Sequence, residues 1–145
     1  MNNDTATASQ YLRNEGYTCV FCREGRVYSS TQRGVKPLLH FIESGTNFSG
    51  FCAADKVVGK AAALLYVLLG VKDVYAPVMS ETALYTLARN GIVPLCDFSI
   101  KSIRNRSDTG SCPMEEAVAD IDEPRQALTA IQNKLKILKE RRDDR

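Results

Sequence analysis

The sequence has no tryptophan, a single histidine and little net charge, because 19 basic and 17 acidic residues leave +2 over 145 residues. Proteins that bind nucleic acid usually carry a concentrated basic patch, and those that bind single strands add aromatic side chains on which bases stack. Here the charges are balanced and the aromatic residues are scattered along the chain. We therefore expect no nucleic-acid partner.

Long hydrophobic runs and a targeting signal are also missing. The longest apolar-rich stretch, Val57 to Val71, is interrupted by Gly59, Lys60 and Gly70, so it is too short for a membrane span. The first residues lack the basic region and apolar run of a secretory signal. The five cysteines are an odd number, which favours reduced thiols. We expect a cytoplasmic protein with no membrane partner.

What is present is typical of one globular domain: 44% hydrophobic and 25% charged residues in a chain long enough for a buried core. Apolar periodicity and turn residues predict alternating helices and strands. Helices are predicted over 5–15, 37–44, 55–69, 81–89, 112–121 and 124–142, and strands over 17–23, 26–30, 48–54, 71–79 and 92–98. This order predicts an α/β fold whose mixed sheet carries helices on its faces, with 101–111 mostly loop.

The last predicted helix is amphipathic and is treated apart from the α/β domain. Its apolar residues follow one another at spacings of three and four, as in a short coiled-coil seam: Leu128, Ile131, Leu135 and Leu138. We divide the chain into an α/β domain over 1–122 and this helix over 123–145. The seam either packs on its own domain or forms a homodimer contact.

Several strings of the sequence resemble a known family. They are Glu15-Gly16, Thr18-Cys19-Val20, Arg33-Gly34-Val35-Lys36-Pro37-Leu38-Leu39, Ala54-Asp55-Lys56-Val57-Val58-Gly59-Lys60-Ala61-Ala62-Ala63, Ser80-Glu81, Asn105-Arg106 and Cys112-Pro113-Met114-Glu115. Together they resemble a small bacterial and archaeal family of unknown function, whose best-known member is a Thermotoga protein with a cytidine-deaminase-like fold. The resemblance covers roughly residues 6 to 121. It implies a three-layer α/β/α sandwich and leaves the activity open.

The sequence lacks the zinc motifs of the deaminases. Those enzymes place a His or Cys ligand and a catalytic Glu at one helix start, and a Pro-Cys-x-x-Cys pair at the next. The corresponding starts here, where Asp55 and Ser80 are the predicted caps of the helices over 55–69 and 81–89, contain no histidine or cysteine, and His40 lies in another helix. Cys19 and Cys22 are three apart in a predicted strand, so their side chains point to opposite faces. We predict no metal site, no zinc-dependent deaminase activity and no cofactor.

The string from Asp55 to Lys60 is the most informative candidate for a binding site. If Asp55 caps the helix predicted over 55–69, Lys56 and Lys60 lie four residues apart on one helical face. Helix N-termini attract anions through their free N–H groups and dipole, and Gly59 would permit a close approach. The alternative is a capped, buried helix whose lysines reach solvent. A phosphate-binding P-loop is excluded, because Ala54 stands where that motif needs glycine.

Two further helix starts carry candidate residues. Arg33 and Lys36 precede Pro37 and form either a turn with solvated charges or a second wall of the same anion pocket. Cys112 falls at a helix N-cap, where the dipole favours a thiolate, and Glu115 is spaced to return a capping-box bond. The alternative for Cys112 is a buried cysteine in an ordinary capped helix.

Our leading hypothesis is a non-zinc, deaminase-like domain that binds a small anionic or nucleotide-like molecule. The candidate ligand-binding residues are Arg33, Lys36, Asp55, Lys56, Gly59, Lys60, Ser80, Asn105, Arg106, Cys112 and Glu115. One alternative is a cysteine-dependent enzyme or redox protein with Cys112 as its catalytic residue, although no histidine is in view as its base. Another is a structural or regulatory module that dimerises through the terminal helix.

Overall fold

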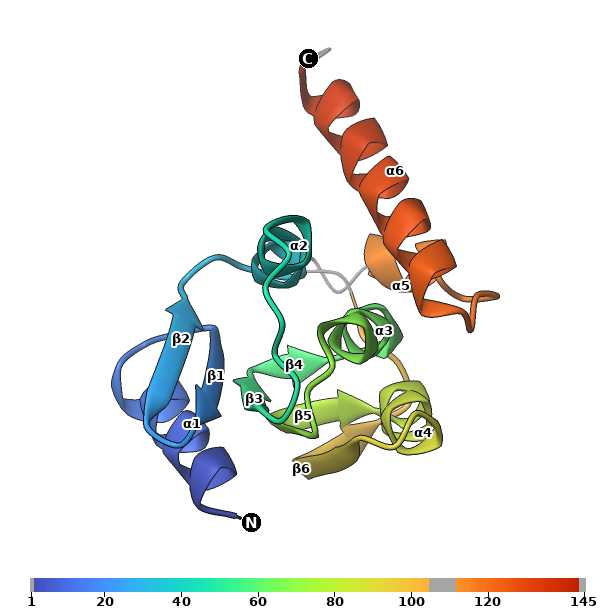
Figure 1. The fold of residues 1–145 in the computed structure, drawn as a ribbon. Coiled ribbons are helices and arrows are strands. Elements are labelled where there is room, and N and C mark those ends of the chain that lie inside the picture. The colour runs from blue at the N-terminus through green and yellow to red at the C-terminus, as the bar shows by residue number, and fades with distance from the viewer. Residues whose placement is uncertain (1, 105–111, 144–145) are drawn as a thin grey trace.

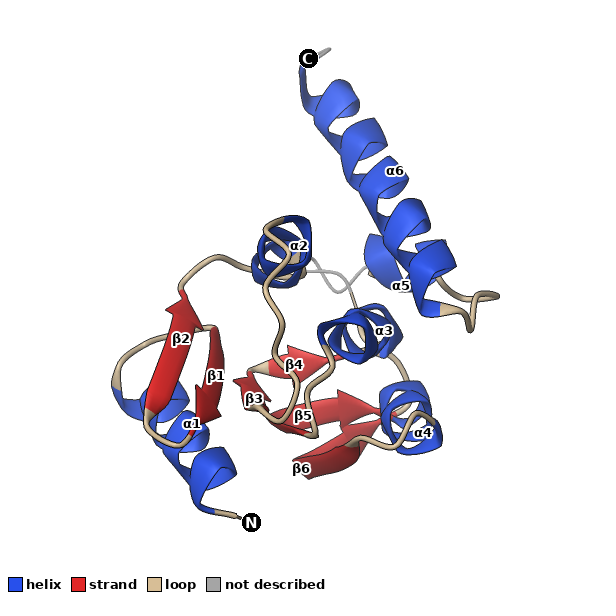
Figure 2. Ribbon diagram, viewed as in Figure 1, coloured by secondary structure: helices blue, strands red, loops and turns tan. Residues whose placement is uncertain are grey.

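The chain forms a mixed α/β fold in which one six-stranded sheet lies between helices (Figures 1 and 2). The computed structural model describes residues 2–104 and 112–143. The helices are α1 (Asn3–Asn14), α2 (Lys36–Glu43), α3 (Lys60–Leu69), α4 (Glu81–Arg89), α5 (Pro113–Ala117) and α6 (Pro124–Asp143). The strands are β1 (Cys19–Arg23), β2 (Arg26–Ser30), β3 (Cys52–Asp55), β4 (Val57–Val58), β5 (Asp73–Ser80) and β6 (Val93–Ile100).

The sheet is mixed, as the sequence predicts. The hairpin strands β1 and β2 are antiparallel, β1 pairs antiparallel with β3, and β3, β4 and β6 all run parallel to β5. Strands β3 and β4 follow one another along one edge of β5, and the register skips Pro77. Proline has no N–H to donate to the ladder. The interruption between β3 and β4, at Lys56, therefore lies beside this proline.

Helices cover the two faces of the sheet unequally. Among the helices of the described residues, α1 alone packs on one face, over a small core of Ala8, Leu12, Val20, Cys22, Ala54 and Tyr75. Helices α2, α3 and α4 lie on the other face, as Figure 2 shows, over the larger core. Cys19 belongs to the larger core and Cys22 to the smaller one, so the prediction that these two thiols face opposite sides is confirmed.

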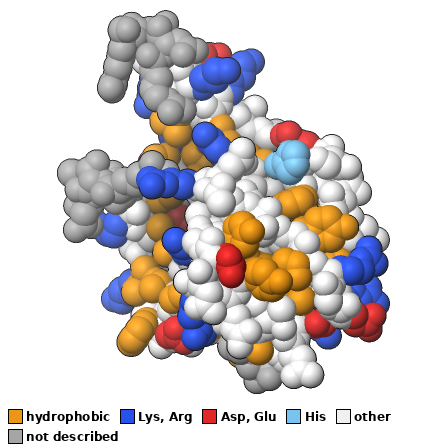
Figure 3. All heavy atoms as spheres, turned by 90° about the vertical axis from the view of Figure 1, so that its left-hand side faces the viewer, with side chains coloured by type: hydrophobic (Ala, Val, Ile, Leu, Met, Phe, Trp, Pro, Cys, Tyr) orange, Lys and Arg blue, Asp and Glu red, His pale blue; other side chains and the backbone are white. Residues whose placement is uncertain are grey.

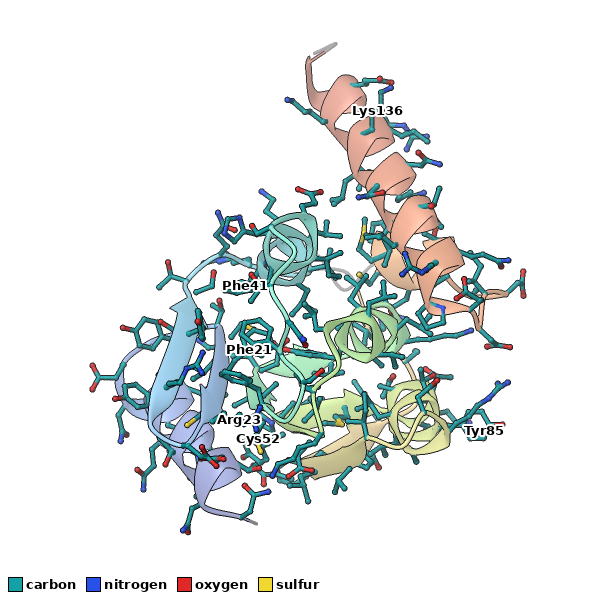
Figure 4. All side chains as sticks on the ribbon, in the orientation of Figure 1. Phe21, Arg23, Phe41, Cys52, Tyr85 and Lys136 are labelled. Atoms are coloured by element: carbon teal, nitrogen blue, oxygen red, sulfur yellow. The ribbon has the colours of Figure 1, made fainter. Side chains whose placement is uncertain are left out.

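Aromatic rings fill the larger core between β1 and α2. The rings of Phe21 and Phe48 stack with their centroids 3.9 Å apart, and Phe41 meets Phe21 edge-on at 5.4 Å. Figure 4 shows Phe21 and Phe41 turned toward one another from their two elements. Helix α3 is buried along most of its length against this cluster, as its nearly continuous apolar sequence predicts.

Helix α6 packs on α3 and then projects beyond the rest of the fold (Figure 1). Ala127 and Ile131 are fully buried, and Leu128 and Leu135 pack against the larger core. Most of the predicted seam therefore contacts its own domain. Within the described ranges, no helix is long and apolar enough to cross a membrane.

Several predicted boundaries are wrong, and strand pairing explains the largest error. The helix predicted to begin at Asp55 begins at Lys60, because Asp55 pairs with Cys19 and the next two-residue strand pairs with β5. Strand β3 starts only at Cys52, after a loop in which Phe48 and Phe51 are buried. The helix predicted over 112–121 is shorter, and β6 runs on to Ile100.

Candidate functional site

A pocket of about 500 Å³ opens where β3 gives way to β4, beside the start of α3. The segment before α2 and the segment around α5 form its other walls. The residues that line it are Thr18, Arg33, Gly34, Val35, Asp55, Lys56, Val57, Gly59, Ala61, Ala62, Ile103, Arg104, Cys112, Met114 and Glu115. Six of the eleven residues singled out from the sequence are among them: Arg33, Asp55, Lys56, Gly59, Cys112 and Glu115. The fold thus brings together three chain segments that are far apart in the sequence.

Asp55 is the buried acid of this pocket, and it does not cap α3 as predicted. It ends β3 with 9% of its surface exposed. One carboxylate oxygen accepts a hydrogen bond of 2.7 Å from the Tyr66 hydroxyl, and the other accepts one of 2.7 Å from the Lys56 backbone N–H. Burial outweighs these bonds and raises the pKa of Asp55 to about 6. Asp55 can therefore change its protonation state near neutral pH.

Tyr66 links Asp55 to a third buried group. Its hydroxyl oxygen lies 3.4 Å from the Cys19 sulfur, so Cys19, Tyr66 and Asp55 form a chain of polar groups inside the core. Burial raises the pKa of both Cys19 and Tyr66 well above their ordinary values. Sequence reasoning missed Tyr66, which is the one polar side chain in the apolar run of α3. Such an isolated polar residue in a buried helix is a signal that could have found it.

The start of α3 is capped by a residue from far along the chain. The two carboxylate oxygens of Glu115 accept hydrogen bonds from the backbone N–H groups of Lys60 and Ala61, at 2.7 and 2.8 Å. Gly59 makes this approach possible, because a Cβ atom there would lie 2.1 Å from a Glu115 oxygen. The predicted capping box between Glu115 and Cys112 is wrong, and Cys112 makes no side-chain cap. The anion that α3 attracts is thus a carboxylate of the protein itself.

The two lysines predicted to share a helical face are separated in the structure. Lys56 precedes β4, is exposed and lines the pocket. Lys60 is the first residue of α3, and its ammonium group points elsewhere: Nζ donates to the Ala119 carbonyl at 3.1 Å and pairs with Asp122 at 3.2 Å. Lys56 and not Lys60 therefore supplies positive charge to the pocket.

The remaining predicted residues divide between the pocket and other places. Arg33 lines the pocket, and Arg104, which sequence reasoning did not single out, also lines it. Lys36 is exposed at the start of α2, outside the lining. Ser80 caps α4, because its hydroxyl accepts a bond of 3.0 Å from the Ala83 N–H. Asn105 and Arg106 lie outside the described residues.

Cys112 faces the pocket without a histidine beside it. His40 lies on α2 and contributes to a different pocket. Within residues 2–104 and 112–143, no group of three or more His, Cys, Asp or Glu side chains is arranged to hold a metal ion. Besides the basic side chains of Arg33, Lys56 and Arg104, the titratable groups in the lining are therefore Asp55, Glu115 and the Cys112 thiol.

A second pocket, of about 480 Å³, lies beside β2 and α2. Its lining is aromatic and hydroxylated: Tyr17, Tyr28, Ser29, Ser30, Thr31, Gln32, Pro37, His40 and Phe41. Figure 3 shows hydrophobic side chains gathered below the pale-blue histidine on this face. None of the predicted ligand-binding residues lines this second pocket, and it offers neither a carboxylate nor a lysine or arginine.

Comparison with known proteins shows which family the chain belongs to. Residues 7–135 match the family described as "Domain of unknown function (DUF1893)", and the chain is a member of that family. The match reaches 14 residues past the end of the resemblance read from the sequence at 121, into α6. The fold is similar to that of a DUF1893 family protein from Thermotoga maritima, with a TM-score of 0.85 and 23% sequence identity over 92% of this chain and 91% of that one. No curated protein matches the sequence.

Proposed function

We propose that this DUF1893 chain binds a small anionic, nucleotide-like molecule in the pocket between α2, α3 and α5. One observation carries the proposal: a buried hydrogen-bond acceptor, Asp55, shares a pocket of about 500 Å³ with the basic side chains of Arg33 and Lys56. Small-molecule sites typically combine such a volume with a few convergent polar groups. A residue with a raised pKa in a pocket is a further mark of a functional site.

The lining suits a ligand with two unlike ends. The lining includes the apolar side chains of Val35, Ala62 and Met114, which together with the Asp55 carboxylate suit a flat ring whose N–H groups donate to that carboxylate. Arg33 and Lys56 suit a phosphate or carboxylate group on the ligand. A nucleoside phosphate has both ends, whereas inorganic phosphate has only one.

We further propose that the fold is a three-layer α/β/α sandwich of the cytidine-deaminase-like type without the zinc site. The distribution of helices over the two faces of the mixed sheet supports this. Asp55 ends β3, and β4 and Gly59 lie between it and the start of α3, the helix that would correspond to the first zinc-binding helix of a deaminase. The pocket of this chain would then keep the location of a deaminase site and use hydrogen bonds in place of the metal.

The direct test is a thermal-shift screen of the purified protein against nucleobases, nucleosides, nucleotides and phosphorylated metabolites. A ligand at one hundred times its dissociation constant adds about 2.7 kcal/mol of stability. We expect nucleotides to raise Tm more than their nucleosides, and inorganic phosphate alone to have little effect. A flat screen on well-folded protein would overturn the proposal.

Variants locate the site. Replacing both Arg33 and Lys56 with alanine should abolish the difference between nucleotide and nucleoside, because both exposed side chains would supply the phosphate contact. Lys136→Ala is the matched control, since Lys136 lies on the projecting part of α6 (Figure 4). Equal loss of binding in the control, or no loss in the double variant, would show that the ligand binds elsewhere.

A further inference from the structure

Cys22 and Cys52 face one another across two adjacent strands. They are directly paired in the antiparallel register of β1 and β3, so their side chains project from the same face of the sheet. Opposed residues in an antiparallel pair have Cα atoms about 4.5 to 5.5 Å apart. A disulfide needs a Cα separation of about 4.4 to 6.8 Å. The paired register therefore places the two Cα atoms within the range that a disulfide allows.

None of the other three cysteines shares this arrangement. Cys19 lies on the same strand as Cys22 but on the opposite face, next to Tyr66. Cys96 packs against the larger core, and Cys112 lines the pocket by α5. All five thiols are free in this structure.

The first turn of α1 covers the paired thiols. The Cys52 sulfur lies 3.5 Å from the Asn2 side-chain oxygen and 3.6 Å from an Asp73 oxygen, and the Cys22 sulfur lies 3.9 Å from an Asp4 oxygen. Figure 4 shows Cys52 beside this end of the helix. Both thiols are buried, with 1% and 0% of their surfaces exposed. Because the turn lies over both buried sulfur atoms, its local opening would admit a reagent to the pair.

We propose that Cys22 and Cys52 form a reversible cross-strand disulfide, with the first turn of α1 gating access of the oxidant. The oxidant is a low-molecular-weight disulfide. One protein thiolate attacks it, forms a mixed disulfide and releases one small thiol. The second protein thiolate then attacks the protein sulfur of that mixed disulfide, which forms the Cys22–Cys52 bond and releases the second small thiol. Two protons leave the protein and two electrons reduce the oxidant.

The surroundings set the rate of this reaction. Burial raises the pKa of both thiols, and the nearby Asp4 carboxylate raises the pKa of Cys22 further. Only the thiolate attacks a disulfide, so oxidation should speed up as the pH rises. Opening of the α1 turn should also raise the rate, because it exposes both sulfur atoms.

The test is peptide mapping of the full chain after incubation with oxidised glutathione at about pH 8.5, near the pKa of an ordinary thiol. Remaining thiols are alkylated before digestion with trypsin. We expect the peptide over 14–23 to be joined to the peptide over 34–56, with fragmentation placing the bond at Cys22 and the alkyl group on Cys19. Bonding of Cys19, Cys96 or Cys112 instead, or five alkylated cysteines, would overturn the proposal.

Two pairs of variants sharpen the test. Cys22→Ala should abolish the cross-link, whereas Cys19→Ala on the same strand should retain it; the mapping of unmodified protein decides the matter if either variant fails to fold. Asn2→Ala removes the cap of α1, whose side chain accepts from the Thr5 N–H at 2.8 Å. Loss of a helix cap should make oxidation about fivefold faster. The neighbouring exposed Asn3→Ala is the control, and equal rates in the two variants would contradict the gating.

Discussion

The N-termini of helices α3 and α4 are capped in different ways, although both sequences predict a cap from a residue next to the helix. Helix α4 is capped by Ser80, the residue immediately before it. Helix α3 follows Gly59 and is capped by Glu115, 55 residues further along the chain. A local cap belongs to the helix alone, whereas a remote cap ties the helix to another segment. At α3 that tie also closes one wall of the candidate pocket.

Replacing Asp55 should give the largest change in the free energy of unfolding. The pH dependence of that change shows whether Asp55 caps α3 or is a buried acid. A capping aspartate would have a lowered pKa and would stabilise the fold as the pH rises. Asp55 instead has its pKa raised from 3.8 to about 6 in the folded protein. Between these values the folded state binds more protons than the unfolded one, so stability falls as the pH rises from about 4 to 6. The total loss at this site is about 3 kcal/mol.

Asp55→Asn removes this dependence. Urea unfolding at a series of pH values should show the variant gaining about 3 kcal/mol relative to the wild type between pH 4 and 6.5 or so. Asp97→Asn is the matched control, because Asp97 also accepts a hydrogen bond from a tyrosine hydroxyl but is exposed. A relative loss of stability for Asp55→Asn as the pH rises would mean that Asp55 acts as a cap after all.

Glu115→Ala should destabilise the protein by about 2 kcal/mol, since two charge-assisted hydrogen bonds are lost and water can replace part of them. The measurement is the free energy of unfolding in urea. Its neighbour Glu116 is exposed, so Glu116→Ala should change stability by less than about 0.5 kcal/mol. Equal losses of stability in the two variants would contradict the role of Glu115 as the cap of α3.

Gly59→Ala should act through the same contact. A Cβ atom on residue 59 would displace the Glu115 carboxylate and would also lie 2.8 Å from Ile103. The double variant with Glu115→Ala should therefore lose much less stability than the two single variants do in sum. The difference, which is the coupling energy, should be about 1 to 2 kcal/mol. Additive losses would show that Gly59 is required for a reason unrelated to Glu115.

Ser80→Ala should have the smallest effect of the series, about 1 kcal/mol, as is usual for a side-chain N-cap. Its loss should add to that of Glu115→Ala, because the two caps share no hydrogen-bond partner. A double-variant cycle by urea unfolding measures this. Strong coupling between them would mean that the two helix starts are one cooperative unit.

The contrast between the two helix starts also explains what the sequence could predict. Ser80 was identified correctly because its partner, Ala83, is three residues away. Asp55 was mistaken for a cap because the pattern of an acid before an apolar run does not reveal that strand pairing continues through Val58. The Glu115 contact depends on how α5 packs on α3, and local propensity carries no information about such a contact.

The candidate pocket was predicted in part for the same reason. Arg33, Asp55, Lys56 and Cys112 were selected because each lies near a helix start, and the fold brings these starts together. Lys60 was misassigned because its side chain turns toward Asp122, which is far along the chain. The pattern of the helix that begins at Lys60 does not reveal this contact. Tyr66 was overlooked because its role appears only once β3 lies beside α3.

The central claim, that a small anionic ligand occupies the pocket, is tested most directly by the alkylation rate of Cys112, which lines the pocket and is partly exposed. The rate is measured by mass spectrometry at increasing concentrations of each nucleotide in the panel. The account predicts that nucleotides which raise Tm also slow the alkylation of Cys112, in a saturable manner that requires Arg33 and Lys56. Stabilising nucleotides that leave the Cys112 rate unchanged would contradict it.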